Sequence, residues 1–225
     1  PVLTVDDVTR TYLVRRRGTF NAFNEIKAVR DVSFVVRAGE NFGIVGESGC
    51  RKSTLTRLLA WLEKPDAGRI GFLGKDLASL SVRSLTDLRQ SFQLLLQDPY
   101  GSLPANMPVR RMIEEPLLIH GRSSAEATAM AQAAMKEVGL EPDLANSLPV
   151  GLSAGQRQRI NIARALVLKP RLLILDETLS ALDQVEQAEL LDLFTRLQAA
   201  HGFSYVFISH DLALVRRMCN RIAVM

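Results

Sequence analysis

One stretch decides the fold of this chain: Gly46-Glu47-Ser48-Gly49-Cys50-Arg51-Lys52-Ser53-Thr54. It follows a short apolar run, residues 42–45, that is typical of a buried strand. It precedes leucines at 55, 58, 59 and 62, whose spacing predicts one apolar helix face. A strand, a glycine-rich turn and a helix form the setting of a phosphate-binding loop, where backbone N–H groups and the helix dipole attract an anion. We expect Lys52 to reach the β- and γ-phosphates and Ser53 to offer its hydroxyl to Mg²⁺.

Arg51 departs from the phosphate-loop pattern G-x-x-x-x-G-K-[ST], which has glycine at that position. Glycine there lets the backbone approach a phosphate closely. A long cationic side chain either clashes with the nucleotide or places its guanidinium on the phosphates, and the sequence leaves both open. The alternative for the whole stretch is an ordinary Gly/Ser loop between a strand and a helix.

Composition sets the broad class of the protein. The 225 residues suffice for one large domain, or for a domain with a subdomain. A hydrophobic content of 47% and a charged content of 23% are ordinary for a globular protein, and a net charge of +4 does not require nucleic acid. Two cysteines, Cys50 and Cys219, provide no disulfide framework and favour a reducing compartment. No apolar run approaches the roughly 20 residues that span a bilayer, so we expect any membrane association to pass through a partner.

The segments on either side of the phosphate loop differ in character. Residues 2–36 alternate apolar with polar side chains, which predicts antiparallel strands, and the polar, basic segment 12–28 is expected to connect them. Tyr12 is either a core aromatic or a stacking platform for a base, and its position alone favours the core. Residues 100–150 begin with three prolines that interrupt helix formation, and an Ala/Met/Gln/Glu-rich helix at 125–138 follows. We therefore predict a helical subdomain inserted into an α/β core.

Three apolar runs end in polar side chains. The runs 92–96, 172–175 and 205–208 predict buried strands, which end at Gln97, at Asp176-Glu177 and at His210. Ligands bind at the carboxyl ends of the strands in open α/β sheets. Asp176 suits Mg²⁺ held through water, and Glu177 suits a general base that activates a water. Gln97 is either a strand cap or a ligand donor, and the strand-end position of His210 favours a ligand contact over the core.

A helix begins near residue 153 with a capping-box pattern. Ser153 is followed three positions later by Gln156, which gives S-x-x-Q. The helix is predicted to run to about residue 168 and to stop near Pro170. Its N–H groups are available to an anion, although a capped surface helix explains the pattern equally well.

Taken together, these pieces resemble the ATP-binding cassette ATPases over essentially the full length of the chain. The similarity is closest to the nucleotide-binding subunits of bacterial peptide and nickel importers. The stretches that carry it are GESGCRKSTLTRLL, QDPYGSL, LSAGQRQRINIARAL, LLILDETLSALD and VFISHDL. The resemblance implies an α/β fold, with a P-loop NTPase-type, mostly parallel sheet, an N-terminal antiparallel β subdomain and an inserted helical subdomain. It implies that 1–99 and 151–225 form the RecA-like nucleotide-binding core with the β subdomain. Residues 100–150 then form the helical subdomain, which extends into the signature helix.

The resemblance also implies catalytic and metal-binding roles. Residues 46–54 match Walker A, with Lys52 on the phosphates and Ser53 on Mg²⁺. Gln97 matches the glutamine that contacts Mg²⁺ and the attacking water. Asp176 matches the Walker B aspartate, Glu177 the catalytic glutamate and His210 the switch histidine.

The remaining matched positions are implied to bind nucleotide. The signature motif is matched by Ser153, Ala154, Gly155 and Gln156, and in this family that helix N-terminus contacts the γ-phosphate bound by the other subunit. Asp183 matches the D-loop. Tyr12 matches the aromatic that stacks on adenine, and this overrides the positional preference for the core.

The implied mechanism is phosphoryl transfer from ATP to water, with Mg²⁺ as cofactor. The implied partners are transmembrane permease subunits, whose coupling helix enters a groove of segment 100–150, and a second ABC ATPase domain in a homo- or heterodimer. A periplasmic or extracellular substrate-binding protein is implied as an indirect partner. The resemblance implies no nucleic-acid partner. The expected location is the cytoplasmic face of the inner membrane, as a peripheral subunit, and the expected process is uptake of dipeptides or oligopeptides.

Several positions depart from the family pattern and keep alternatives open. Arg51 replaces the Walker A glycine, Ala154 replaces the second residue of the usual L-S-G-G-Q, and Thr178 replaces a proline after the Asp-Glu pair. Val150-Gly151 also replaces a His-Glu pair common in the peptide-importer branch. One alternative is the degenerate, weakly hydrolysing half of an asymmetric or fused pair. Another is a non-transport ABC ATPase. The sequence contains no long coiled-coil insert, which argues against that alternative.

Overall fold

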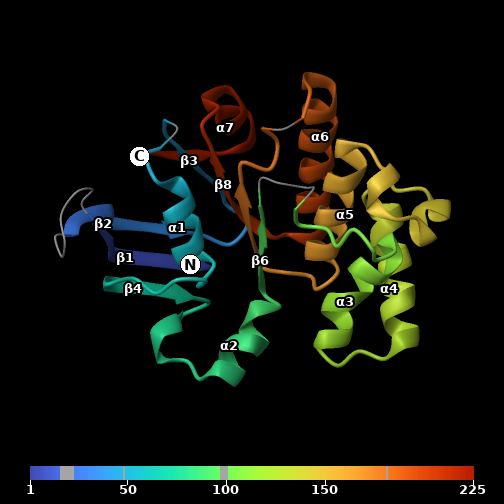
Figure 1. Ribbon diagram of the computed structural model, residues 1–225, viewed down its shortest axis with the longest axis horizontal. Helices are drawn as coiled ribbons and strands as arrows, with labels where there is room; N and C mark the ends of the chain where they lie inside the picture. Colours follow the sequence, from blue (N-terminus) through green and yellow to red (C-terminus); the bar gives the residue numbers. More distant parts are fainter. Residues whose placement is uncertain (16–22, 48, 97–100, 181) are drawn as a thin grey trace.

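The computed structural model describes residues 1–15, 23–47, 49–96, 101–180 and 182–225. They form two sheets with helices packed around them (Figure 1). The antiparallel sheet has the strand order β2-β1-β4-β5. Its strands are β1 (Leu3–Arg15), β2 (Phe23–Val36), β4 (Ala67–Phe72) and β5 (Lys75–Asp76).

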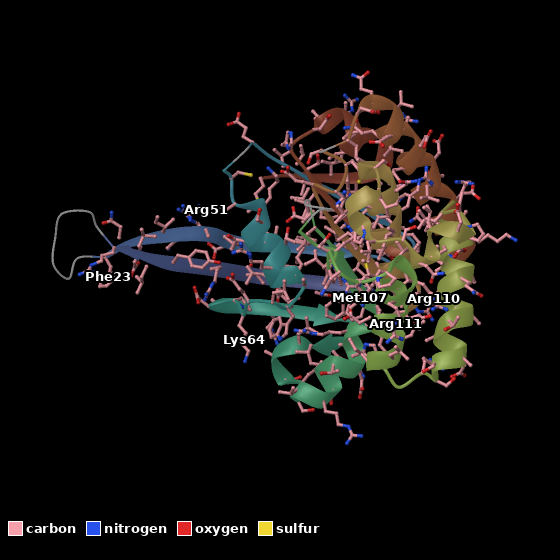
Figure 2. The ribbon with its side chains drawn as sticks, turned by 45° about the vertical axis from the view of Figure 1, so that its right-hand side comes forward. Phe23, Arg51, Lys64, Met107, Arg110 and Arg111 are labelled. Atoms are coloured by element: carbon pink, nitrogen blue, oxygen red, sulfur yellow. The ribbon has the colours of Figure 1, made fainter. Side chains whose placement is uncertain are left out.

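The β1–β2 pair is longer than the sequence indicated. Its register runs from Leu3↔Val36 to Arg15↔Phe23, and Tyr12 pairs with Ile26 inside it. The prediction that residues 12–28 form a connection was therefore wrong for 12–15 and 23–28, which lie in β1 and β2, whereas 16–22 lie outside the described residues. Pairing continues through this polar segment because the backbone of two adjacent strands satisfies its own hydrogen bonds whatever side chains it carries. The β1–β2 ribbon extends away from the body of the molecule, with Phe23 near its far end (Figure 2).

The second sheet is parallel and has the order β6-β7-β8-β3-β9. Its strands are β3 (Asn41–Val45), β6 (Phe92–Leu95), β7 (Leu172–Asp176), β8 (Ser204–Ser209) and β9 (Arg221–Val224). The four strands predicted from the runs 42–45, 92–96, 172–175 and 205–208 are confirmed. Both faces of this sheet are buried, since Leu172 and Ile174 pack toward the antiparallel sheet and α1, whereas Leu173 and Leu175 pack toward the helices on the other face. A continuous apolar run is what a strand with two buried faces needs.

In Figure 1, α3 to α6 build the right-hand part of the molecule, and the described helices as a whole pack around the sheets. They are α1 (Lys52–Leu59), α2 (Val82–Arg89), α3 (Val109–Ile119), α4 (Ser124–Glu137), α5 (Ala154–Leu166), α6 (Gln184–His201) and α7 (Leu212–Met218). Three short 3₁₀ turns lie at Leu77–Ser79, Pro142–Asn146 and Pro149–Gly151.

Two details of the helix predictions were wrong. Leu62 is 56% exposed and lies beyond α1, whose buried face ends at Leu59. Trp61 takes a left-handed backbone conformation (φ 53°) and turns the chain away from the helix axis. Pro116 lies inside α3 and does not end it, because the buried residues Met112, Ile113 and Leu117 anchor the helix on both sides of the proline.

The parallel register brings the functional segments to one edge of the sheet. Val45 pairs with Ser209, and Asp176 pairs with Ile208. The residues that follow these strands therefore emerge side by side. Of the helices that the structure describes, none combines the length and apolarity needed to cross a membrane.

Candidate functional site

The loop between β3 and α1 folds around the side chain of Lys52. The Lys52 ammonium donates hydrogen bonds to the backbone carbonyls of Gly46 (2.7 Å) and Glu47 (3.0 Å). Its side chain is only 5% exposed, although lysine is rarely buried without partners. The lysine is therefore held inside the ring of the loop, where a phosphate bound by the loop would meet it.

Gly46 is required at the start of this loop by close packing. A Cβ atom there would lie 2.6 Å from the sulfur of Cys50 and 2.6 Å from the carbonyl oxygen of Met225, the residue after β9. Contacts that short do not occur with real side chains, so any larger residue would displace the loop. The first glycine of the pattern is explained by this approach of two backbone segments.

Arg51 occupies the position before α1 in a left-handed conformation, with φ 72° and ψ 28°. Residues with a Cβ adopt this region at a cost, which glycine avoids. Within the described residues, the Arg51 side chain makes no capping bond to the helix. Figure 2 shows Arg51 beside α1, on the side of the molecule from which the β1–β2 ribbon extends. The glycine of the pattern is thus favoured here by backbone conformation as well as by closeness to a ligand.

Glu177 joins Lys52 to His210. Oε1 of Glu177 lies 3.7 Å from the Lys52 ammonium, and Oε2 lies 3.0 Å from Nδ1 of His210. Glu177 directly follows β7, has a positive φ of 50°, and donates its backbone N–H to Ile208 in β8. These restraints turn its side chain from the sheet toward the loop. The structure thus brings together the predicted phosphate-binding cation, general base and histidine.

Asp176 is the last residue of β7 and is 7% exposed. Burial raises the pKa of its carboxyl group, and the neighbouring Glu177 carboxylate raises it further. Ser53 lies in the first turn of α1 and is exposed. A carboxylate and a hydroxyl are the hard oxygen donors that Mg²⁺ prefers, and a buried carboxylate with a raised pKa gains most from a cation. The donors present therefore fit Mg²⁺.

Tyr12 is half-buried near the end of β1 and is held by acidic and basic neighbours. Its hydroxyl donates a hydrogen bond of 2.5 Å to Glu63, in the turn after α1. The guanidinium of Arg10 lies 5.0 Å from the centre of the Tyr12 ring and 3.6 Å from the Glu63 carboxylate. The Tyr12 hydrogen bond lowers the pKa of Glu63. Glu63 therefore holds the Tyr12 side chain at its hydroxyl, and Arg10 contacts one face of the ring.

The predicted capping box is confirmed at the start of α5. Ser153 Oγ accepts the N–H of Gln156 (3.1 Å), and the Gln156 side chain accepts the N–H of Ser153 (2.9 Å). The N–H of Gly155 is bound by Oε1 of Glu186 in α6, at 3.2 Å. Asp183 is the N-cap of α6 and accepts two N–H groups of its first turn. The predicted signature segment therefore contacts α6, and α5 lies apart from α1 with β6 between them in the view of Figure 1.

Two contacts at these sites were missed by the sequence analysis. Glu63 and Glu186 lie 51 and 31 residues from their partners Tyr12 and Gly155. Glu63 sits in a turn of mixed polarity, and Glu186 has the ordinary pattern of an acidic residue in the first turn of a helix. Neither carries a local signal of its contact. Ser48 and Gln97 lie outside the described residues, so their predicted roles stay predictions.

Comparison with known proteins agrees with this geometry. The family model described as "ABC transporter" matches residues 29–180. A probable peptide ABC transporter ATP-binding protein of Sinorhizobium fredii is 42% identical over the whole chain, which spans 64% of that relative. An oligopeptide transport ATP-binding protein of Haemophilus influenzae is 46% identical over 89% of the chain, which spans 61% of it. A solved dimeric ATP-binding cassette in a post-hydrolysis state bound to ADP and Pi superposes with a TM-score of 0.84 at 27% identity, covering 99% of this chain and 94% of that one.

Proposed function

Because this chain belongs to the ABC transporter family, we propose that it binds and hydrolyses ATP to power transport of peptides through a membrane permease. The substrate class is supported by the relatives named as peptide or oligopeptide transport proteins. The observation that carries the ATPase proposal is the chain of contacts from Lys52 through Glu177 to His210. This contact supports the proposal, because a cation that can bind phosphate lies 3.7 Å from a carboxylate that can take a proton from water.

Each residue of the site has a part in the proposed reaction. Lys52 and the loop N–H groups bind and orient the triphosphate. Asp176 and Ser53 hold Mg²⁺, which supplies charge neutralisation at the phosphates when bound. Glu177 positions the attacking water and accepts its proton, while His210 holds the second carboxylate oxygen of Glu177 and so orients the first. Tyr12 stacks on adenine.

The signature residues act on the nucleotide of a second ABC domain in this proposal. The N-terminus of α5 carries the exposed Ser153, the partly exposed Ala154 and the buried Gly155, apart from this chain's own phosphate loop. A site completed only by a partner subunit explains why these residues do not converge on Lys52. The solved dimeric cassette of the same fold supports a dimer of this type.

A cleft between the core and α3 is the proposed docking site of the permease. It has a volume of about 410 Å³ and lies between the end of β6, α3 and α5. Its polar lining is ordered by the Arg164–Glu115 ion pair and by a hydrogen bond of 2.9 Å from Asn161 to Ser102. Ile119 on its lining is 69% exposed, which suits an apolar helix from a membrane partner.

Arg51 supports a second candidate, in which this domain is the weaker half of an asymmetric pair. Its left-handed backbone places strain in the loop expected to hold the phosphates. The two candidates share the fold and the site, and they differ in nucleotide affinity.

The experiment that tests the function measures Mg²⁺-ATP binding and turnover in the complete protein. Glu177→Gln should retain ATP binding and lose hydrolysis by at least about 100-fold, since general base catalysis contributes about 10²–10⁴-fold. Glu189→Gln is the matched control, because Glu189 is an exposed acid that pairs with Arg159 on α5. Failure of the parent protein to bind ATP would reject the proposal, whereas tight binding without turnover would favour the weaker-half candidate.

A further inference from the structure

The carboxylate of Glu186 lies against the N-terminal turn of α5. Its Oε1 lies 3.2 Å from the backbone nitrogen of Gly155 and accepts that N–H. The carboxylate is also packed against the glycine itself, since a Cβ on Gly155 would lie 2.7 Å from Oε1 and 3.2 Å from the carboxylate carbon. Gly155 is buried and Glu186 half-buried, so this is a shielded contact between α5 and α6.

The contact matters because of where Gly155 lies in its helix. The first N–H groups of an α-helix have no partner within the helix, and their dipole favours an anion. Gly155 is the second residue of α5, and the N–H of Gln156 next to it is already taken by Ser153. The N–H of Gly155 would otherwise be a donor open to an incoming anion, and the Glu186 carboxylate is an anion of the same chain that already binds it.

We propose that Glu186 is a further residue of the composite ATP site, where its carboxylate competes with the γ-phosphate presented by the partner subunit for the N–H of Gly155. The inference rests on the proposed function, since it requires that the start of α5 receives that phosphate. Closure of the two subunits then requires Glu186 to rotate away. Its carboxylate also opposes the approach of the triphosphate by charge repulsion.

The local structure allows Glu186 to leave without damage to its own helix. Asp183 caps α6 by accepting the N–H groups of Val185 and Glu186, each at 2.9 Å. The Glu186 side chain is therefore not needed for this cap. Its rotation exposes the N–H of Gly155 while the Ser153–Gln156 capping box keeps α5 in place.

The test compares ATP-dependent dimerisation with ATP binding by the single subunit. In the complete protein, with hydrolysis blocked by Glu177→Gln, the parent, Glu186→Gln and Glu186→Ala are titrated with Mg²⁺-ATP. Light scattering reports the dimer, and a fluorescent ATP analogue at high dilution reports binding by the subunit. The matched control is Glu189→Gln, one turn further along α6, which removes the same charge but faces Arg159.

Competition predicts a specific pattern across these variants. Glu186→Ala should lower the ATP concentration for half-maximal dimerisation by about tenfold, as expected when a charged competitor for one hydrogen bond is removed. Glu186→Gln should give a smaller shift, because its amide oxygen still accepts the N–H without the charge. ATP binding by the single subunit should be unchanged, and Glu189→Gln should match the parent in both measurements.

Other results would overturn the inference. No shift in dimerisation for either Glu186 variant would show that the carboxylate does not compete, and an equal shift for Glu189→Gln would show a general charge effect of α6. If ATP binding by the single subunit and ATP-dependent dimerisation improved equally, the effect of Glu186 would not arise from its competition with the partner's γ-phosphate. If the parent bound no ATP in the fluorescence assay, the proposed function would fail first and the inference with it.

Discussion

The Lys52 ammonium lies 3.7 Å from Oε1 of Glu177, so the predicted phosphate-binding cation and the predicted general base contact each other directly. Both side chains are shielded from water, with exposed fractions of 5% and 17%, which strengthens their attraction. A bound triphosphate would surround Lys52 with anionic oxygens and weaken its hold on Glu177. The carboxylate would then be available to water while His210 retained Oε2. Under the proposed function, nucleotide binding and activation of the base would thereby be coupled through one lysine.

Replacement of Arg51 by glycine should stabilise the protein and improve ATP binding. A left-handed residue with a Cβ costs roughly 1–2 kcal/mol, so Arg51→Gly should raise the free energy of unfolding by about 1 kcal/mol after the greater backbone entropy of glycine is counted. ATP affinity should rise about fivefold, as measured by titration alongside thermal unfolding.

Lys169→Gly is the control for Arg51, because Lys169 has a φ of 53° in the turn between α5 and β7, away from the phosphate loop. It should stabilise the fold without a change in ATP affinity. Weaker ATP binding by Arg51→Gly would show instead that the guanidinium sits on the phosphates.

The Tyr12–Glu63 hydrogen bond should strengthen binding of the adenine base of ATP and should have no effect on binding of its phosphates. Tyr12→Phe and Glu63→Ala each release the ring from its tether, so each should weaken ATP binding about three- to tenfold. Affinity for inorganic tripolyphosphate should stay the same. The double variant should lose no more than either single one, and additive losses would mean that the two side chains act independently.

Asp176→Asn should have opposite effects on ATP hydrolysis, which should fall, and on folding stability, which should rise. Hydrolysis should fall by at least about 100-fold, because a bound metal contributes several kcal/mol of charge stabilisation. The folded protein should become more stable at neutral pH. Burial raises the pKa of Asp176 on folding, so the folded state binds this proton more tightly, and the associated stability is lost as pH rises through the folded-state pKa.

The pH dependence provides the check on Asp176. The stability advantage of Asp176→Asn, measured by denaturant unfolding without nucleotide, should be absent at a pH below the ordinary Asp pKa of about 4 and should grow as pH rises. An advantage that is independent of pH would point to packing and not to the buried charge.

Cys50 should react with alkylating reagents, and Mg²⁺-ATP should protect it. Its sulfur lies 3.8 Å from the Lys52 ammonium in the phosphate loop, so a bound triphosphate would cover it. Cys219 is an internal control, because burial raises the pKa of its thiol to about 12 and leaves little thiolate to react. Mass spectrometry of the labelled protein should show ATP-dependent protection at Cys50 and slow labelling at Cys219 in both conditions. Equal labelling of Cys50 with and without ATP would count against binding at this loop.

Much of this architecture follows from local patterns in the sequence. The strand before Gly46, the buried run ending at Asp176 and the capping box of Ser153 each depend on neighbours within a few residues, so periodicity and capping rules were enough to predict them. The length of the β1–β2 pair was missed, because its outer part mixes exposed apolar residues such as Leu13 and Val14 with polar ones and therefore shows no regular alternation. The tethers on Tyr12 and Gly155 come from residues distant in the chain, and only the folded structure reveals them.

The order of the parallel sheet has a consequence for how the protein is made. Among the strands that the structure describes, the neighbours of β3, which leads into the phosphate loop, are β8 and β9, whose residues begin at 204 and 221. During synthesis β3 must therefore wait, with its apolar side chains and backbone groups unpaired, until more than 150 further residues have been added. Such late, non-local pairing slows folding and leaves an aggregation-prone strand exposed in the nascent chain. The strand that leads into the phosphate loop, although it ends at residue 45, therefore gains both of these partners only after residue 224 has been added.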